Sequence, residues 1–196
     1  SGKVVTVNPT YDTTCASGPA APSITSPSSG TLTNDSTPDI GGTAPANSTV
    51  TVYDGGLNIG TTTASGSGVW SFTPASSIGE GASSITATAT DATGTSSPSG
   101  AITINVDTVA PAAPAITSSG GLTNDNTPTI SGTSEANATV IVFDGASVIG
   151  SSTANGSGVW SFTPAGSIGE GAHSITASAT DAANNPGPPS SPAVAI

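Results

Sequence analysis

The stretch TNDSTPDIGGTAPANSTVTVYDG at residues 33–55 returns as TNDNTPTISGTSEANATVIVFDG at residues 123–145. Farther along the chain VWSFTPA and SIGEGA recur letter for letter, and Trp70 and Trp160 lie 90 residues apart, as the other matched pairs do. A period of this length is too long for a helical solenoid or a propeller blade, but it suits one autonomous β-sandwich domain. The chain of 196 residues is therefore predicted to contain two such domains.

Within each repeat, apolar residues alternate with small polar ones, as in TVTVY at 49–53 and SITASAT at 174–180. This alternation is typical of strands with one buried and one solvent-exposed face. The abundant Thr and Val are β-branched and favour strands. The sequence thus predicts an all-β protein of two tandem immunoglobulin-like Greek-key β-sandwich domains. We expect seven strands in each repeat, near residues 22–26, 37–43, 48–54, 57–64, 68–73, 83–90 and 100–106, and again 90 residues later.

The aromatic residues of each repeat lie on one strand and point to one face. Trp70 and Phe72 are two positions apart, as are Trp160 and Phe162. Two aromatic side chains are about what a small sandwich needs to fill its core, so we predict that they anchor the core. The alternative is an exposed platform on which sugars stack.

A proline-containing linker separates the repeats. Residues 107–114 read DTVAPAAP, and a similar segment with three more residues begins at Asp12. We predict the end of a preceding module and its linker in residues 1–19, repeat one in 20–107 and repeat two in 108–196. No apolar run approaches the ~20 residues of a membrane-spanning helix.

The charge balance restricts the possible partners. The net charge is −11, and Lys3 is the only basic residue apart from one histidine. Without a basic patch the chain cannot neutralise phosphates, which argues against nucleic acid as a ligand, and an anionic membrane surface would repel it. Cys15 is the only cysteine, so no internal disulfide forms. The carboxylates must be solvated, protonated or bound to cations.

Acidic residues converge at one pole of repeat two if the fold is correct. In a Greek-key sandwich the BC and FG loops lie at the pole where the chain enters. These loops carry Glu135 and, in the FG loop, Asp181 and Asn184, while the linker begins at Asp107. Ca²⁺ takes six to eight oxygen ligands from carboxylates, amides, carbonyls and water. We therefore predict a Ca²⁺ site at the junction of the two repeats.

Other acids are weaker candidates for the same chemistry. Asp35 and Glu80, from the opposite pole of repeat one, would face the junction as further ligands or as local negative potential. In repeat one itself the corresponding acids are Asp12 and Asp91, but Pro45 stands where repeat two has its BC-loop acid. We expect poorer or absent cation binding there.

Single acids also have an ordinary structural role, because Asp and Asn bond their own backbone in turns. Asp54 and Asp144 lie in D-G hairpin turns, where the turn role is favoured. His173, the only histidine, stands where repeat one has Ser83, and is expected to be a surface loop residue. No G-x-S-x-G, H-E-x-x-H or phosphate-loop motif is present, so no enzyme activity is predicted.

Taken together, the T-N-D-x-T-P opening, the G-x-W-S-F-T-P strand, S-I-T-A-x-A-T-D-A and the D-T-x-A-P linker resemble bacterial Ig-like repeats. These are tandem modules of large type I-secreted (RTX-type) surface adhesins and biofilm-associated proteins, and the resemblance covers nearly the whole chain. It implies sandwiches arrayed end to end with Ca²⁺ at the linkers. By the family motif the ligands are the linker acids Asp107 and Asp12, the BC-loop Glu135, and the FG-loop Asp91 and Asp181.

The expected function is a structural extender, or stalk, of a bacterial surface adhesin that supports cell adhesion and biofilm formation. Such a chain would be extracellular and monomeric, with neighbouring repeats as its partners and a host or surface ligand bound through other domains. The alternative is a carbohydrate- or receptor-binding Ig-like module of a secreted enzyme or phage tail fibre. The near-identity of the loops in the two repeats favours the extender.

Overall fold

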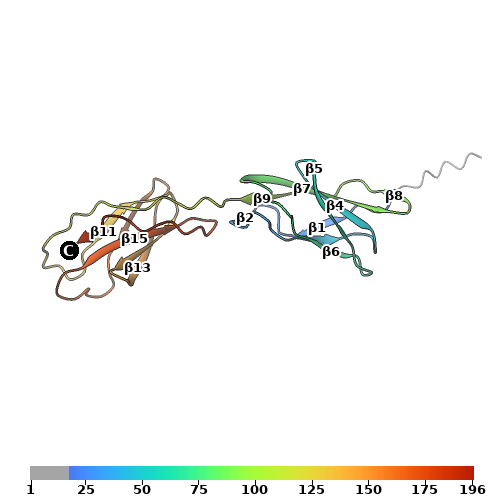
Figure 1. Cartoon of the computed structure of the whole chain (residues 1–196). Coiled ribbons are helices and arrows are strands. Elements are labelled where there is room, and N and C mark those ends of the chain that lie inside the picture. Colours follow the sequence, from blue (N-terminus) through green and yellow to red (C-terminus); the bar gives the residue numbers. More distant parts are fainter. Residues whose placement is uncertain (1–17) are drawn as a thin grey trace, which may run out of the picture. The chain divides into compact units, whose positions relative to one another are not determined.

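The computed structural model describes residues 18–196, and every regular element among them is a β-strand (Figure 1). The predicted all-β organisation in two tandem sandwiches is confirmed. The predictions for Asp12 and Cys15 concern residues outside this range. Between residues 18 and 196, no helix is long and apolar enough to cross a membrane.

Repeat one folds into two sheets. The first holds three strands in the order β1 (Ser23–Ser26), β3 (Ile40–Thr43) and β6 (Val69–Phe72). The second runs in the order β2 (Thr31–Thr33), β9 (Ile102–Val106), β7 (Gly81–Asp91), β4 (Thr49–Asp54) and β5 (Leu57–Thr63), and the short β8 (Gly94–Thr95) pairs with the end of β7.

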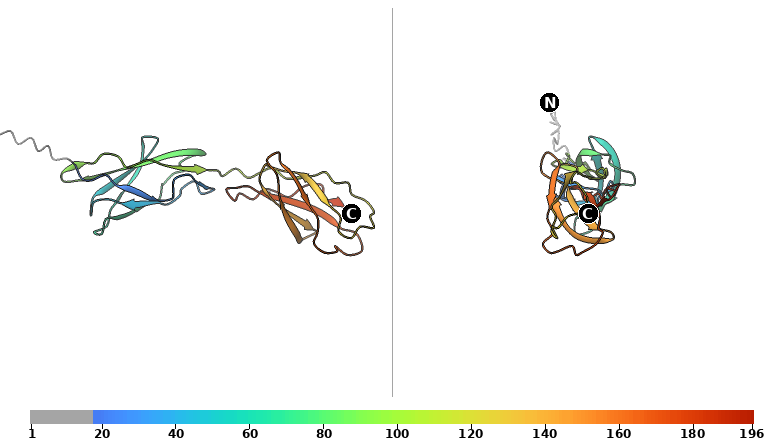
Figure 2. Two further views of the ribbon diagram at one scale, coloured as in Figure 1. Left: turned by 180° about the vertical axis from the view of Figure 1, so that it is seen from behind. Right: turned by 90° about the vertical axis from the view of Figure 1, so that its left-hand side faces the viewer.

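Repeat two has the same plan. One sheet contains β10 (Ala115–Ile116), β11 (Ile130–Thr133) and β14 (Val159–Phe162). The other contains β13 (Ser147–Thr153), β12 (Thr139–Asp144), β15 (Ser174–Thr180) and β16 (Val194–Ala195) in that order. Figure 2 shows the strands of each unit from two further sides. All seven strands predicted for each repeat have a counterpart here, whereas β2 and β8 were not predicted.

The core forms where the two sheets face each other. The apolar members of the alternating pattern, such as Val50, Val140 and Ile175, are fully buried. Trp70 and Trp160 are 2% and 1% exposed, so the core-anchor prediction is confirmed and the sugar-platform alternative is wrong. Burial of a large aromatic side chain removes much apolar surface from water and so contributes strongly to the stability of a small domain.

A glycine at a bulge makes room for the second aromatic of each repeat. Pairing between β4 and β5 shifts register beside Val52, which lies opposite Gly60. Gly60 has φ +148°, and a Cβ there would clash with the ring of Phe72. The equivalent Gly150, with φ +156°, meets Phe162 in the same way. The lack of a side chain at these glycines therefore leaves room for the phenylalanine ring.

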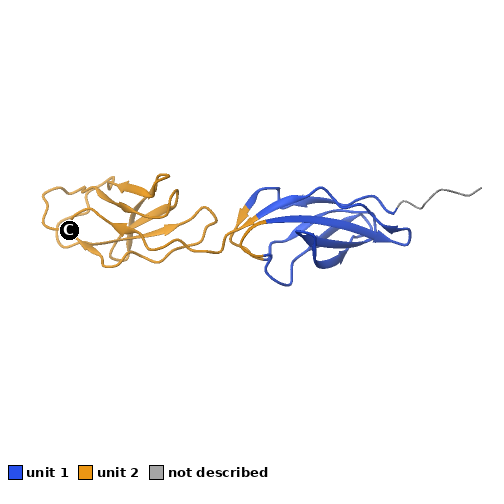
Figure 3. Ribbon diagram, turned by 90° about the horizontal axis from the view of Figure 1, so that it is seen from above, with its two compact units in different colours: residues 1–31, 37–78, 83–104 blue, residues 32–36, 79–82, 105–196 orange. Residues whose placement is uncertain are grey.

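The division of the chain into compact units does not follow the repeat boundary. The second unit contains Asn105–Ile196, and in addition Leu32–Ser36 and Gly79–Ala82 from the AB and EF loops of repeat one (Figure 3). The remaining described residues up to Ile104 form the first unit. Contacts of these two loops with the linker are thus internal to the second unit.

Candidate functional site

The FG loop of repeat two is organised by a buried carboxylate. Asp181 directly follows β15 and is 7% exposed, as is Asn185. The two oxygens of Asp181 accept hydrogen bonds from the backbone N–H and the side-chain amide of Asn185, both at 2.8 Å. Asn184 between them has φ +72°, a left-handed conformation that asparagine tolerates. The loop is therefore a tight turn closed on Asp181.

This turn keeps Asp181 ionised although it is buried. Burial by itself raises the pKa of Asp181. Hydrogen bonds from the side chain and backbone of Asn185 and from the N–H groups of Ala183 and Asn184 lower this pKa, and together they outweigh the effect of burial. The net result is a pKa below the ordinary value for Asp. All of these donors are neutral amides. A carboxylate buried among neutral donors is an anion without a compensating positive charge.

The same amide ties the FG loop to the linker. Besides Asp181, the side-chain nitrogen of Asn185 donates to the backbone carbonyl of Asp107 at 2.7 Å. The carboxylate of Asp107 in turn accepts the N–H of Val109 at 3.1 Å, and its own N–H bonds to the carbonyl of Thr33 at 2.9 Å. The first residue of the linker is thus held at its N–H, its carbonyl and its side chain.

Glu80 holds the second residue of the linker. Its two carboxylate oxygens accept the backbone N–H of Thr108 at 3.1 and 3.2 Å, and one of them also accepts the Thr108 hydroxyl. Charge-assisted hydrogen bonds of this kind are about twice as strong as neutral ones. Glu80 therefore anchors the linker, whereas the sequence suggested a further cation ligand or a source of local negative potential.

The structure brings together only some of the residues predicted as calcium ligands. The backbone of Asp107 lies beside the carboxylate of Asp181, and the carbonyl of Asn184 accepts a hydrogen bond from the side chain of Asn34 at 3.2 Å. Glu135 is exposed and lines a separate shallow hollow with Ala112, Ala113, Ala115, Thr133 and Ser134. Asp35 lies on the exposed AB loop of repeat one. From residue 18 onward, no group of three or more His, Cys, Asp or Glu side chains is placed to hold a metal ion.

Asp91, the repeat-one counterpart of Asp181, makes a different turn. Its carboxylate accepts both the backbone N–H and the hydroxyl of Thr93, at 2.7 and 2.6 Å, and it is exposed. The side-chain hydrogen bond from Thr93, followed by the backbone one, lowers the pKa of Asp91. Among the residues from 18 onward, its hydrogen-bond partners lie within the same turn.

The donor chemistry around the Asp181 turn fits a hard cation, although the number of side chains is small. The available groups are oxygens of two carboxylates, Asp107 and Asp181, together with the carbonyl of Asn184. Ca²⁺ accepts carboxylate, carbonyl and water oxygens in a flexible shell, so water would have to complete the set of six to eight. A buried, ionised carboxylate that meets only neutral donors is the feature that suits a cation.

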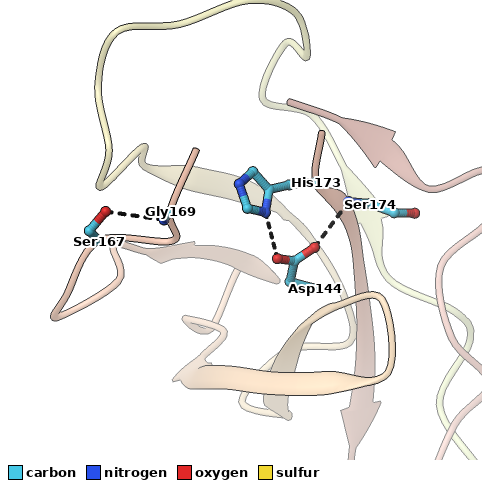
Figure 4. A network of polar contacts seen from close by, with 5 residues as sticks. All are labelled: Asp144, Ser167, Gly169, His173 and Ser174. Atoms are coloured by element: carbon cyan, nitrogen blue, oxygen red, sulfur yellow. Dashed lines mark hydrogen bonds and ion pairs between the residues drawn. The ribbon is translucent and has the colours of Figure 1, made fainter. Parts of the chain in front are cut away.

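A second polar cluster joins the D-G hairpin turn to the start of β15. Nδ1 of His173 lies 2.6 Å from Asp144, whose other oxygen accepts the backbone N–H of Ser174 at 3.1 Å (Figure 4). In repeat one Ser83 donates to Asp54 at 3.1 Å. Both aspartates therefore have the structural turn role that the sequence favoured.

His173 is not the exposed loop residue that its position suggested. Its side chain is only 12% exposed, because it packs between the turn at Asp144 and the EF loop (Figure 4). Nε2 is buried and has no hydrogen-bond partner among residues 18–196. The contact of Nδ1 with Asp144 fastens the EF loop to the hairpin turn.

Comparison with protein families gives a match over both repeats. The family described as bacterial Ig-like domain matches residues 19–108 and again 113–196. The chain belongs to the bacterial Ig-like domain family. Ig-like and fibronectin-like domains are in general non-catalytic modules, which agrees with the structural role of the His173 pair. Comparison with curated protein sequences gives no match.

Solved structures share the sandwich fold. Fibronectin type III-like modules of Clostridium thermocellum CbhA are 22% identical, with a TM-score of 0.54 over 88% of this bacterial Ig-like chain and 91% of theirs. The FN1–FN3 domains of chicken CNTN1 are 14% identical, with a TM-score of 0.50 over 92% and 68%. The BSP domain of a biofilm-associated protein is 22% identical, with a TM-score of 0.35 over 91% and 29%. The likenesses to the CbhA modules and to CNTN1 show the fold alone.

Two residues of this bacterial Ig-like chain have roles that sequence reasoning missed. Asn185 connects the FG loop to the linker, although its neighbour Asn184 was the predicted ligand. Glu80 anchors the linker through Thr108. One signal was present in the sequence: the FG loops of the two repeats differ, since residues 93–96 read TGTS in repeat one and residues 183–186 read ANNP in repeat two.

Proposed function

We propose that this chain is an extender, or stalk, module of a bacterial surface adhesin that supports adhesion and biofilm formation outside the cell. Two successive bacterial Ig-like domains with matching cores and loops support this proposal. The observation that carries it is the hydrogen-bonded linker, in which Asn185 holds Asp107 and Glu80 holds Thr108. Hydrogen bonds of this kind restrain the backbone of the linker, and a spacer needs restrained connections between its modules.

Calcium is the proposed reinforcement of this linker. Asp181 and Asp107 would hold the ion, with the carbonyl of Asn184 and water completing the oxygen shell. A bound Ca²⁺ supplies the positive charge that the buried Asp181 carboxylate otherwise lacks. The residues themselves orient the linker, since Asn185 fixes its carbonyl and Glu80 its N–H.

The composition supports an extracellular, type I-secreted parent of the RTX kind. Cys15 is the only cysteine and the net charge is −11, so no internal disulfide forms and the acids have few cationic partners. A chain of this kind could leave a low-calcium cytoplasm unfolded and gain rigidity outside, where calcium is available. We propose neighbouring repeats of the same chain as its partners, with the target bound by other domains of the parent.

The alternative, a carbohydrate- or receptor-binding module, gains no specific support. Sugar sites commonly use an exposed aromatic ring, but Trp70 and Trp160 are buried. The cavity in repeat two is lined by residues 122–126, 168–173 and Ile196. None of these residues is Trp, Tyr or Phe. We therefore retain the extender.

The proposal is tested by thermal unfolding and calorimetric titration with Ca²⁺ and with EDTA. Ca²⁺ is expected to raise the melting temperature, and Asp181→Asn is expected to abolish that rise. The matched variant Asp91→Asn, at the same position of repeat one, should keep it. A melting temperature that is the same in Ca²⁺ and EDTA for the unaltered chain would show that the acids are solvated turn residues and that calcium has no part in the stalk.

A further inference from the structure

The turn between β13 and β14 holds the single Asn-Gly pair of the sequence, Asn155 and Gly156. Both residues are exposed. An asparagine followed by glycine can lose its side-chain nitrogen as ammonia, because the next backbone nitrogen attacks the side-chain carbonyl and closes a five-membered imide ring. Glycine permits this attack, since it has no side chain to hinder the approach of its nitrogen. The pair therefore carries a reaction that needs no enzyme, provided that the turn presents it correctly.

The turn fixes the side-chain carbonyl of Asn155. Its oxygen, Oδ1, accepts the N–H of Ser157 at 2.9 Å and the N–H of Val159 at 3.0 Å. Two N–H donors at one atom identify that atom as the oxygen and not the nitrogen of the amide. The hydrogen bond to the residue two positions on folds the side chain back over the intervening peptide. This fold brings the amide carbon toward the nitrogen of Gly156.

The same two N–H groups suit the reaction as well as the turn. When the nitrogen of Gly156 adds to the amide carbon, negative charge develops on Oδ1 of Asn155. Backbone N–H groups about 2.7–3.1 Å from such an oxygen stabilise the charge, as in the oxyanion holes of acyl-transfer enzymes. Both distances to Oδ1 fall in this range. The Gly156 N–H donates to no acceptor among residues 18–196, so the attacking nitrogen is available.

Repeat one shows that the turn itself does not require an amide. Ser65 stands where repeat two has Asn155, and its hydroxyl accepts the N–H of Val69, the counterpart of Val159, at 3.0 Å. The backbone bonds are also equivalent, since the N–H of Ser65 bonds to the carbonyl of Val69 at 2.8 Å and that of Asn155 to the carbonyl of Val159 at 2.9 Å. A hydroxyl thus serves the fold, and the amide adds a chemical capability that this turn has only in repeat two.

We propose that Asn155 and Gly156 form a self-modification site, at which the chain converts its own asparagine to aspartate or isoaspartate. The Gly156 nitrogen, after losing its proton to a solvent base, bonds to the amide carbon, and the side-chain carbon–nitrogen bond breaks to release ammonia. Water then opens the imide at either of its two carbonyls, which gives aspartate or isoaspartate. Water is the only co-reactant. The inference goes beyond the stalk function and does not depend on it.

The two products have opposite effects on the turn. An aspartate keeps both N–H contacts and makes them charge-assisted, which strengthens them. An isoaspartate carries the main chain through the side-chain carbonyl and lengthens it by one methylene. This displaces the acceptor of the Val159 N–H at the start of β14, directly before the buried Trp160. Repeat two should therefore melt at a lower temperature in molecules that carry isoaspartate.

The test incubates the full chain in mildly alkaline water enriched in heavy oxygen and follows each asparagine by peptide mass mapping. We expect Asn155 to convert at least about tenfold faster than any other asparagine, with one heavy oxygen incorporated. Hydroxylamine, which traps the imide, should cleave the chain between residues 155 and 156.

Two variants serve as controls for the chemistry. Gly156→Ala should slow the conversion at least about tenfold, because the methyl group hinders the attacking nitrogen. A Cβ at Gly156 meets open space, so this variant keeps the fold, and unchanged tryptophan fluorescence will verify it. Asn155→Ser should abolish the mass change and the cleavage, while the turn is retained as at Ser65.

Three outcomes overturn the proposal. The first is an Asn155 that converts no faster than Asn137, an exposed turn asparagine of the same repeat that precedes alanine. The second is a rate that Gly156→Ala leaves unchanged. The third is slower conversion in the folded chain than in a free peptide of residues 151–161, because the turn would then protect the amide instead of activating it.

Discussion

At the scale of single residues, the hairpin aspartates are the clearest case of one side chain joining two elements. Asp144 closes the turn between β12 and β13 and also accepts bonds from His173 and from the N–H of Ser174. In repeat one Asp54 accepts the equivalent hydrogen bond from Ser83, which stands in place of the histidine. The position therefore requires a donor opposite the aspartate, and either residue can provide it.

Asp144→Ala should accordingly destabilise repeat two by about 1–3 kcal/mol, because it leaves partly buried donors unpaired. His173→Ser should cost less than about 1 kcal/mol, since Ser83 shows that a hydroxyl suits the site. Urea unfolding followed by tryptophan fluorescence measures both. A larger loss for His173→Ser than for Asp144→Ala would contradict the structural role assigned to the aspartate.

The second residue-scale prediction concerns pH. Asp181 has a folded-state pKa below its unfolded value, so its contribution to stability is fully present above the unfolded pKa and is lost as pH falls through the folded one. Repeat two should therefore lose stability below about pH 4, the ordinary range of an Asp side chain. Asp181→Asn should flatten this part of the profile. Denaturant unfolding in EDTA between neutral and acidic pH measures it; an unchanged profile in the variant would show that other groups dominate.

At the scale of elements, the edge of β7 is completed by side chains as well as by strands. β9 pairs with only part of the long β7, and Ser99, which precedes β9, forms hydrogen bonds with another part of β7. Its hydroxyl accepts the N–H of Ala87 at 3.0 Å, and its own N–H bonds to the Ala87 carbonyl at 2.8 Å. Ser190 repeats both contacts with Ala177 in repeat two. A hydroxyl thus substitutes for a backbone acceptor in the ladder.

Ser99→Ala should destabilise repeat one by about 1–3 kcal/mol, because it leaves the buried Ala87 N–H without a partner. The exposed Ser97 is the control, and Ser97→Ala should change the free energy of unfolding by less than about 0.5 kcal/mol. Equal effects of the two substitutions in denaturant unfolding would mean that water replaces the lost hydroxyl.

The elements also show how far the sequence could be read. Alternation located all the main strands and the buried tryptophans, because a period of two assigns each side chain to a face. It did not predict β2 or β8, which are two or three residues long and lie in segments rich in turn residues. The roles of Asn185 and Glu80 were also missed, since each depends on a linker partner 78 or 28 residues away. Local pattern carries no information about such partners.

At the scale of the whole molecule, two sandwich domains are connected by a linker whose residues belong to the second compact unit. Each repeat has a buried tryptophan and apolar residues from both of its sheets, so each has a core of its own. The first residues of the linker, Asp107 and Thr108, are held by hydrogen bonds from Asn185 and to Glu80. Hydrogen bonds to backbone groups each contribute about 1 kcal/mol, a modest restraint that a bound cation would strengthen.

The most direct test of the calcium-stiffened stalk is a distance distribution between the two repeats, measured by single-molecule energy transfer. Ser67→Cys and Ser157→Cys place dyes on equivalent exposed turns, with Cys15→Ser removing the native thiol. The account predicts a narrow distribution in Ca²⁺ that broadens in EDTA, and a broad one in both conditions when Asp181→Asn is added. Distributions of the same width in Ca²⁺ and in EDTA would contradict it.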